Sequence, residues 1–397
     1  MADIERRALY PGSFDPPTNG HKWVMGKVSS DYDKGIVAVG FNPRRPPDRF
    51  TITESVEMLS EIIADSPDLG NLEATSFVGL CQADFAEMLR VRTIIRGTRD
   101  SGDFEAENRA KAINRTINPS IDTVFLAPPH ELNSISSTAV MELIGFEGWE
   151  SIVARMVPRP VFDRLHLKQQ ERDRAFLEKR FSELWQRLDA KGDPVPVADF
   201  IFQMHAESDR AYHNNNHRKM CHNELDLVRD QAEDPDALQL AIDTHDLFYE
   251  TQPKTPGEEI DNEGKSAEYA AKIVTQDMGL SKDFADKVAA LVLATKHTET
   301  PRTQDEQLMV DIDLAIFGRS SRLFDSYEEQ IRQEYLWVPE DFFVQRRAEI
   351  LTRFLPHTDE ESQRPSVYLT PAFRERYERQ AIVNLQRSIA NLRGQSS

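Results

Sequence analysis

The twelve residues from Tyr10 to His21, YPGSFDPPTNGH, constrain the fold of this chain more than any other stretch. The apolar residues before Gly12 predict a strand, and the glycine and prolines that follow end it and predict a loop. From Asn19 onward the sequence can turn helical, so backbone N–H groups at the helix start would face the loop and favour an anion there. Thr18 and His21 lie three residues apart, so a hydroxyl and an imidazole can point at the same phosphate. The alternative is that Thr18 or Asn19 only caps the helix and that His21 is a surface residue.

Strand and helix patterns alternate through the first 150 residues. Further strands are predicted at 36–40, 72–78, 93–96 and 123–126, and helices at 51–64, 83–90 and 103–117. This alternation predicts a doubly wound parallel α/β sheet of the Rossmann-like class, with right-handed crossovers. Ligands of such sheets bind at the carboxyl ends of the strands.

Two arginine-rich segments lie at the ends of predicted strands, where we expect them to meet the loop from Tyr10 to His21 at one crevice. Arg96 and Arg99 lie three residues apart across a glycine and can clamp a polyphosphate, and Arg44 and Arg45 add charge from the neighbouring loop. A single arginine is more often a solvated surface residue, so only the set favours a phosphate site.

A third segment, Ser136, Ser137 and Thr138, precedes an apolar helical pattern and predicts another helix start. Its hydroxyl and N–H groups can hold a second phosphate group. The alternative is that these residues only cap the helix.

Composition limits the classes of function. A chain of 397 residues exceeds what one hydrophobic core usually organises, so two domains are expected. The net charge of −19, with an acid excess in both halves, disfavours a nucleic-acid partner. Cys81 and Cys221 are far apart, which predicts a reducing compartment without a disulfide framework. The sequence has neither an apolar signal segment nor a run near the ~18 apolar residues of a membrane helix, so we expect a cytoplasmic protein without a membrane partner.

Pro158 and Pro160 mark the end of the alternating pattern and predict a boundary between domains 1–158 and 159–397. Beyond it the apolar spacing predicts only helices, so the second domain is expected to be all-α. The predicted helices lie at 163–190, from 234 onward, and at 264–278, 282–296, 304–317, 340–354 and 372–393.

Metal-binding residue types concentrate in the second half. They occur in four short stretches: His213 to His217, His245-Asp246, Lys296-His297 and Asp311 to Asp313. Histidine nitrogens with carboxylate oxygens suit a hard or borderline divalent ion and leave positions open for water and a phosphate. A lone histidine is more often structural than a ligand. Burying the adjacent His245 and Asp246 within an apolar stretch would, however, be costly without a partner.

Residues 6 to about 150 resemble the bacterial-type phosphopantetheine adenylyltransferases of the nucleotidylyltransferase superfamily. The matching motifs are YPGSFDPPTNGH, NPRR, IRGTRDSGDFEAENRAKAINR and SISSTAVMEL, in the family's order and spacing. The resemblance implies transfer of AMP from ATP to 4'-phosphopantetheine, giving dephospho-coenzyme A and pyrophosphate, with Mg²⁺ accompanying the ATP. The reaction is expected to be an in-line displacement without a covalent enzyme intermediate. The family often forms hexamers, which leaves a homo-oligomer open.

The same resemblance implies roles for individual residues. His21, supported by Thr18, would contact the α-phosphate region, and Arg45 would take the acceptor phosphate or the transition state. The remaining residues expected to bind ATP or substrate are Ser13, Phe14, Arg44, Arg96, Gly97, Arg99, Glu107, Ser136, Ser137 and Thr138.

Residues from about 175 to 394 resemble the predicted metal-dependent hydrolases among the HD-domain phosphohydrolases. The matching motifs are AYHNNNH, AIDTHDLFYET, DNEGKSAE, ATKHT, DIDLAIFG and YEEQIRQEY. The resemblance implies that a divalent transition metal, of unknown identity, is held by His217, His245, Asp246 and Asp313. His213 would be a general acid or would position water, and Glu263, Lys296 and His297 would line the pocket. The match favours Asp313 over Asp311 only mildly, so both stay candidate ligands.

Our leading hypothesis is a fusion of an adenylyltransferase with a metal-dependent phosphohydrolase whose substrate is unknown. A phosphate ester near coenzyme A synthesis, such as 4'-phosphopantetheine itself, is one candidate. In the alternative hypothesis the second domain senses a nucleotide and regulates the transferase. A third hypothesis gives the transferase another phosphorylated acceptor.

Overall fold

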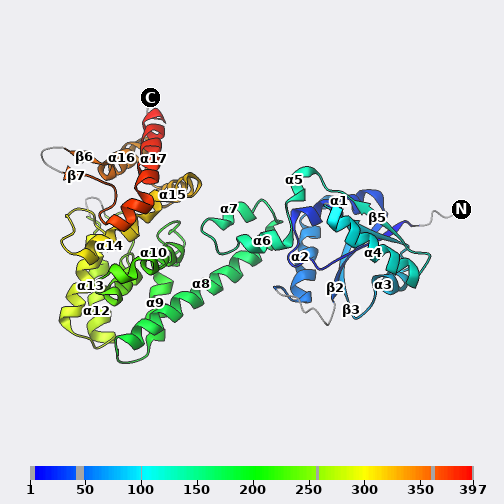
Figure 1. The fold of residues 1–397 in the computed structure, drawn as a ribbon, viewed down its shortest axis with the longest axis horizontal. Coiled ribbons are helices and arrows are strands. Elements are labelled where there is room, and N and C mark those ends of the chain that lie inside the picture. Colours follow the sequence, from blue (N-terminus) through cyan, green and yellow to red (C-terminus); the bar gives the residue numbers. More distant parts are fainter. Residues whose placement is uncertain (1–4, 42–48, 100, 256–258, 359–362, 396–397) are drawn as a thin grey trace. The chain divides into compact units, whose positions relative to one another are not determined.

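Five parallel strands form the central sheet of the N-terminal part of the chain in the computed structural model (Figure 1). The strands are β1 (Arg7–Gly12), β2 (Lys34–Phe41), β3 (Leu72–Val78), β4 (Thr93–Gly97) and β5 (Asp122–Leu126). Their order is β3-β2-β1-β4-β5, and the register places Leu9 beside Ile36 and Ile94. The predicted parallel α/β sheet is therefore confirmed. Because the order reverses between β1 and β4, the carboxyl ends of these two strands flank the crevice where such sheets bind ligands.

Side chains of β1 alternate between two hydrophobic cores, one on each face of the sheet, as the two-residue period of a strand requires. Tyr10 packs with residues of α1 (Asn19–Asp31) and α2 (Ile52–Ala64). Leu9 packs in the second core with Phe85 of α3 (Gln82–Met88). The next helix, α4 (Ser101–Ile117), contacts α3 and β5. Helices on both faces make the sheet doubly wound.

Three short helices follow β5: α5 (His130–Asn133), α6 (Ser137–Leu143) and α7 (Trp149–Val153). Trp149 of α7 is buried in the same core as Tyr10. Val161 and Leu165, in the first turns of α8 (Arg159–Arg187), join that core as well.

The structure describes residues 5–41, 49–99, 101–255, 259–358 and 363–395. The chain divides into two compact units, Met1–Gln170 and Glu171–Ser397, called the N-terminal and C-terminal units below. This division falls within α8, whereas the boundary predicted at residue 158 lies directly before α8 begins.

Among its described residues, the C-terminal unit has helices and two short strands. Its helices after α8 are α9 (Pro194–Met204), α10 (Asn215–Val228), α11 (Pro235–Thr244), α12 (Asn262–Lys272), α13 (Lys282–Ala294), α14 (Gln304–Asp313), α15 (Ser321–Glu334), α16 (Glu340–Phe354) and α17 (Pro371–Gln395). The strands β6 (His357–Thr358) and β7 (Gln363–Arg364) pair antiparallel. The predicted helical character is confirmed, but α9, α10, α15 and the two strands are not among the predicted elements.

Helix α11 is buried along its length. Asp234 caps it by accepting a hydrogen bond from the N–H of Ala237 at 3.1 Å, and Pro235 occupies its first position. Every residue from Ala237 to Thr244 is buried, so other elements surround the helix on all sides. Because α11 ends at Thr244, His245 emerges inside the unit rather than at its surface.

Among the residues that the structure describes, no helix is long and apolar enough to cross a membrane.

Candidate functional site

Thr18 and His21 form a capping box where the loop after β1 enters α1. The hydroxyl of Thr18 accepts a hydrogen bond from the backbone N–H of His21 at 3.4 Å. In return, Nδ1 of His21 accepts from the backbone N–H of Thr18 at 2.9 Å. A ring nitrogen that accepts such a bond carries no proton, so the proton of the neutral imidazole lies on Nε2.

Burial, and then the charges of Arg99 and Arg96, lower the pKa of His21 to about 4. The imidazole is therefore neutral near pH 7, and its Nε2–H is an uncharged hydrogen-bond donor. The ring is held in place by Phe14, whose own ring meets it edge-on at a centroid distance of 5.1 Å.

Gly12 permits the conformation of this loop. Phe14 is fully buried and has a left-handed backbone with φ of 48°. A Cβ atom at Gly12 would lie 3.0 Å from the Phe14 ring, closer than carbon atoms normally approach. Ser13, between them, is exposed.

Arg96 and Glu107 connect the end of β4 to α4. Nε of Arg96 lies 2.5 Å from Oε2 of Glu107, its Nη2 also pairs with Glu107, and its Nη1 donates to the backbone carbonyl of Pro11 in β1. Arg99, beyond Gly97, pairs with Asp103 at 2.7 Å. Both guanidinium groups lie near enough to the loop after β1 for their charges to act on His21. Each of them is already paired with a carboxylate in the structure.

The segment from Ser136 to Thr138 meets the same loop. The hydroxyl of Ser136 caps α6 by accepting from the N–H of Ala139 at 3.0 Å. The hydroxyl of Ser137 donates to the carbonyl of Pro16 at 2.7 Å, while Thr138 is exposed. Arg44 and Arg45 lie outside the described residues.

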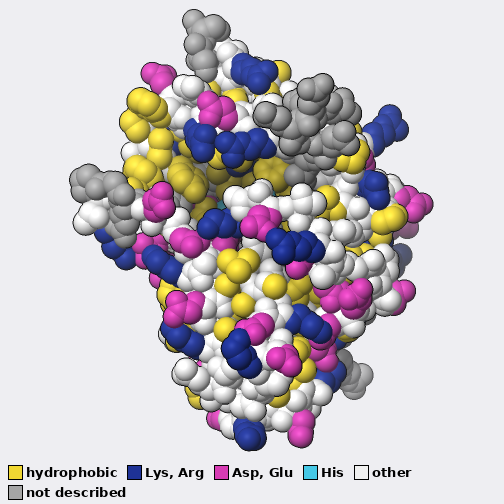
Figure 2. Space-filling model, turned by 90° about the vertical axis from the view of Figure 1, so that its left-hand side faces the viewer, with side chains coloured by type: hydrophobic (Ala, Val, Ile, Leu, Met, Phe, Trp, Pro, Cys, Tyr) yellow, Lys and Arg dark blue, Asp and Glu magenta, His cyan; other side chains and the backbone are white. Residues whose placement is uncertain are grey.

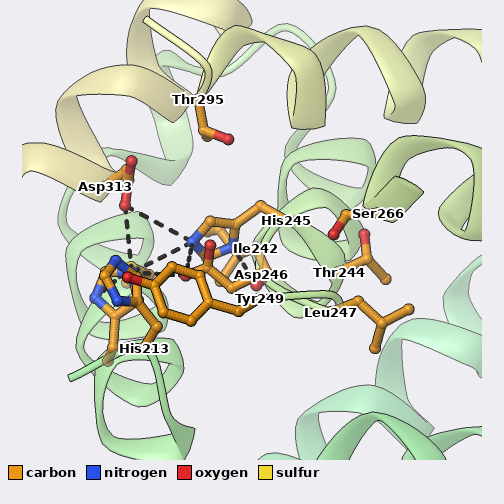
Figure 3. Close-up of polar contacts among 12 residues, drawn as sticks. His213, Ile242, Thr244, His245, Asp246, Leu247, Tyr249, Ser266, Thr295 and Asp313 are labelled. Atoms are coloured by element: carbon orange, nitrogen blue, oxygen red, sulfur yellow. Dashed lines mark hydrogen bonds and ion pairs between the residues drawn. The ribbon is translucent and has the colours of Figure 1, made fainter. Parts of the chain in front are cut away.

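In the C-terminal unit, His217 of α10, His245 and Asp246 after α11, and Asp313 at the end of α14 converge. Figure 3 shows His245, Asp246 and Asp313 in this cluster. Nε2 of His217 lies 3.2 Å from Nε2 of His245, 3.2 Å from Oδ1 of Asp313 and 3.5 Å from Oδ2 of Asp246. Nε2 of His245 lies 3.0 Å from Oδ2 of Asp246 and 3.7 Å from Oδ1 of Asp313. Two ligands held 2.0–2.1 Å from a tetrahedral ion are separated by about 3.3 Å, so these residues are spaced to hold one metal ion.

The hydrogen bonds of His245 also suit a metal ligand. Its Nδ1–H donates to the carbonyl of Ile242 at 3.0 Å, so the neutral ring presents the Nε2 lone pair to the cluster. Because Nε2 then cannot donate, Oδ2 of Asp246 is buried without a hydrogen-bond donor among the described residues. A buried carboxylate oxygen and a buried imidazole nitrogen that face each other at 3.0 Å need either a proton or a cation between them, and a metal ion can fill this position.

His297 contacts the other oxygen of Asp313. Its Nε2 lies 3.2 Å from Oδ2 of Asp313. The backbone of His297 has a φ of 54°, in the left-handed region that residues other than glycine rarely adopt. Next to it, exposed Lys296 pairs with Asp261 at 3.0 Å. Glu263, in the first turn of α12, lies near enough to help raise the pKa of Lys296, for which the hydrogen bond to Asp261 is the main cause.

His213 lies beside the cluster and is held by Glu334. Its Nδ1 is 2.8 Å from Oε2 of Glu334, whose carboxylate also accepts from the backbone N–H groups of Tyr212 and His213 and from the hydroxyl of Tyr249. The His213 ring stacks on Tyr249 at 4.0 Å and is 5.8 Å from the ring of His217. Although burial lowers it, the charges of Asp246 and Glu334 raise the pKa of His213 above its ordinary value.

Asp311 does not face the histidines. Its carboxylate accepts from the N–H groups of Leu369 and Thr370 and from the Thr370 hydroxyl, each at 2.7 Å. Asp311 therefore anchors the segment before α17, and Asp313 is the acid that lies in the cluster.

On the face shown in Figure 2, hydrophobic side chains line a hollow, and Lys and Arg side chains lie at its rim.

Comparison with known proteins places the first part of the chain. A cytidylyltransferase-like family model matches residues 9–143. A phosphopantetheine adenylyltransferase of Neisseria meningitidis is 38% identical over 170 residues, which are 43% of this chain and 98% of the relative. The chain belongs to the phosphopantetheine adenylyltransferase family. Another member, from Chromobacterium violaceum, is 37% identical over 160 residues, 40% of this chain and 95% of the relative. A solved structure of Plasmodium falciparum nicotinic acid mononucleotide adenylyltransferase aligns with 42% of this chain and 96% of its own at 14% identity, with a TM-score of 0.34.

The family model ends at residue 143, and the alignment to the Neisseria meningitidis relative covers 170 residues, whereas the C-terminal unit spans Glu171–Ser397. The likeness to nucleotidyltransferases therefore concerns the N-terminal unit.

Three residues of the C-terminal unit are missed by sequence reasoning. Arg210, almost fully buried, donates to the carbonyls of Asp246 and Leu247 and so fixes the chain that carries two of the cluster residues. Glu334 holds His213, and the Sγ of Cys221 lies 3.7 Å from Nε2 of His217. Cys221 follows His217 by one helical turn, which is a signal the sequence does carry. Arg210 lies 36 residues before Asp246, and Glu334 lies 121 residues after His213, so the spacing along the sequence does not indicate these contacts. Glu334 does fall in the motif YEEQIRQEY, but the motif does not show what it contacts.

Proposed function

We propose that the N-terminal unit transfers AMP from ATP to 4'-phosphopantetheine, giving dephospho-coenzyme A and pyrophosphate. The observation that carries this proposal is the neutral His21, fixed by Thr18 at the carboxyl end of β1. Relatives named phosphopantetheine adenylyltransferase align over nearly their whole length, which supports the choice of acceptor.

In this proposal the acceptor phosphate attacks the α-phosphorus of ATP in line with the departing pyrophosphate. His21 donates the hydrogen bond of Nε2–H to an α-phosphate oxygen and stabilises the charge that develops there, without transferring its proton. Arg96 and Arg99 supply positive charge beside the polyphosphate, for which Glu107 and Asp103 would give up part of their contacts. Mg²⁺ enters as part of the nucleotide substrate.

Pyrophosphate release from ATP by the full chain tests the proposal. A panel of phosphorylated acceptors, with 4'-phosphopantetheine among them, identifies the acceptor. Pyrophosphate release in the presence of 4'-phosphopantetheine supports the proposal. Release only with another acceptor would show that the chain is an adenylyltransferase with a different acceptor specificity.

We further propose that the C-terminal unit is a metal-dependent phosphohydrolase of the HD type. The spacing of His217, His245, Asp246 and Asp313 carries this proposal, because these residues fit one divalent ion. Such an ion, when bound, polarises a phosphate ester and lowers the pKa of a bound water.

The surrounding residues would assist the substrate and the ion. His297 orients Asp313 through its other oxygen, and Arg210 fixes the backbone of Asp246. His213, held by Glu334, would position water or protonate the leaving group. Lys296 and Glu263 would line the approach to the pocket.

Phosphate release by the full chain, loaded in turn with Mn²⁺, Fe²⁺, Co²⁺ or Zn²⁺, tests this second activity. The panel includes phosphate monoesters, nucleotides and 4'-phosphopantetheine, and the His245→Ala variant is the control. No release with any of these metals, together with a transferase rate that responds to an added nucleotide, would instead favour a nucleotide-sensing regulatory unit.

A further inference from the structure

Cys221 lies one turn after His217 on α10, with its side chain completely buried. Its Sγ is 3.7 Å from Nε2 of His217, the same nitrogen that faces His245 and Asp313. Ligand atoms of His217, Cys221 and His245 all lie within 4.8 Å of one another. The cluster therefore contains a sulfur donor, Cys221, in addition to the two histidines and two aspartates of the proposed metal site.

The distance between sulfur and nitrogen fits coordination of one ion. With a metal–nitrogen bond of 2.0–2.1 Å and a metal–sulfur bond of 2.3 Å, two tetrahedral ligands lie about 3.5 Å apart. A buried cysteine often only fills space as a small apolar side chain. Here, however, the sulfur lies beside the buried Nε2 of His217, which is a proposed metal ligand. The sulfur is therefore close to the position that a bound ion would occupy.

We propose that Cys221, together with His217 and His245, binds a thiophilic divalent cation such as Zn²⁺ or Co²⁺ through its sulfur. The sulfur–metal bond forms as the S–H bond breaks, and the thiol proton passes to the solvent. The inference rests on the metal site proposed above and changes its character, because soft sulfur selects ions that oxygen ligands do not. Thiophilic ions therefore gain a sulfur ligand at this site, whereas hard ions such as Mg²⁺ and Mn²⁺ prefer the oxygen ligands of Asp246 and Asp313.

The test is the optical spectrum of the metal-free full chain titrated with Co²⁺. Sulfur ligation gives a thiolate-to-cobalt charge-transfer band in the near ultraviolet, in addition to the visible ligand-field bands of bound Co²⁺. The chain has two cysteines, and exposed Cys81 at the start of α3 provides the matched control. We expect Cys221→Ser to lose the charge-transfer band but keep the visible bands, and Cys81→Ser to keep both.

Zinc X-ray absorption gives a second readout that does not depend on cobalt. The wild-type chain should show one sulfur neighbour at about 2.3 Å from zinc, and Cys221→Ser only nitrogen and oxygen neighbours at about 2.0–2.1 Å. Visible Co²⁺ bands without a charge-transfer band in the wild type would overturn the role of Cys221 and leave the metal site intact. The absence of any bound Co²⁺ would overturn both the metal site and this inference.

Discussion

Nδ1 of His213 lies 2.8 Å from the fully buried carboxylate of Glu334, a residue 121 positions further along the chain. The same carboxylate accepts hydrogen bonds from the backbone of Tyr212 and the hydroxyl of Tyr249. Glu334 therefore fixes both the position and the orientation of the imidazole next to the proposed metal ligands. It lies in the motif YEEQIRQEY, but the motif does not indicate which residue Glu334 contacts.

Substitution of Glu334 by Gln should lower phosphohydrolase activity. The amide cannot stabilise a protonated His213, and outer-shell partners of this kind typically contribute a factor of about 10–100. The bound metal per chain should stay unchanged, as measured by elemental analysis. Glu340→Gln, which alters an exposed pair with Arg332, is the control and should behave like the wild type. Equal rates for the two variants would remove Glu334 from the site.

Substitutions of Asp313 and Asp311 should have different effects, one on metal binding and the other on the free energy of unfolding. Asp313→Asn should lose the bound metal, because its carboxylate lies 3.2 Å from His217. Asp311→Asn should keep the metal but lower the free energy of unfolding by about 1.5–3 kcal/mol, because the amide cannot accept all three of the hydrogen bonds that now reach the carboxylate. Elemental analysis and urea unfolding of both variants measure the two effects. Loss of metal from Asp311→Asn alone would reverse the assignment.

The imidazole of His21 should stay neutral to low pH. Because its pKa in the folded chain is lowered to about 4, protonation favours the unfolded chain as the pH falls from the ordinary value of about 6.5 towards 4. The stability that the neutral ring contributes is therefore complete above about pH 6.5 and is lost as the pH falls towards 4. NMR titration of the His21 ring should give a midpoint near 4, and His21 should cause no change in transferase rate between pH 7 and 8. A midpoint near 6.5 would show that the ring is solvated.

Gly12→Ala should destabilise the N-terminal unit and slow the transferase. The added methyl group would meet the Phe14 ring at 3.0 Å, and forcing a group into a packed site typically costs about 1–3 kcal/mol. Displacement of Phe14 would also move His21, against which it packs. Gly26→Ala in α1 is the control, since its methyl group has open space, and should gain about 0.5–1 kcal/mol of stability. Thermal unfolding and pyrophosphate release measure both variants. Two equally stable and active proteins would contradict the packing described here.

The order of the elements could be predicted from local patterns, because apolar runs and capping signals lie within the segments that they define. The run IVAVG lies in β2, and Thr51 with Glu54 forms the capping box at the start of α2. The strands β6 and β7 are only two residues each, too short to give a pattern. Helix α15 contains most of the motif YEEQIRQEY. This motif indicates a resemblance to a family, but it does not define where the helix begins.

The proximity of site residues could be predicted only in part. Strand order brings the ends of β1 and β4 together, so the neighbourhood of His21 and Arg96 follows from a parallel sheet. The engagement of Arg96 by Glu107 does not follow, because Glu107 is eleven residues away on a separate helix. In the same way, Asp311 and Asp313 have the same chemistry, and only the packing of the segment before α17 distinguishes them.

Formation of dephospho-coenzyme A from ATP and 4'-phosphopantetheine by the full chain is the most direct test of the account, measured for the wild type, His21→Ala and His245→Ala. We predict that the wild type forms the product and that His21→Ala is slower by about 10²–10³-fold, the usual effect of removing one transition-state hydrogen-bond donor. His245→Ala, which changes only the C-terminal cluster, should form the product at the wild-type rate. Wild-type rates for His21→Ala, or no product from the wild-type chain, would contradict the account.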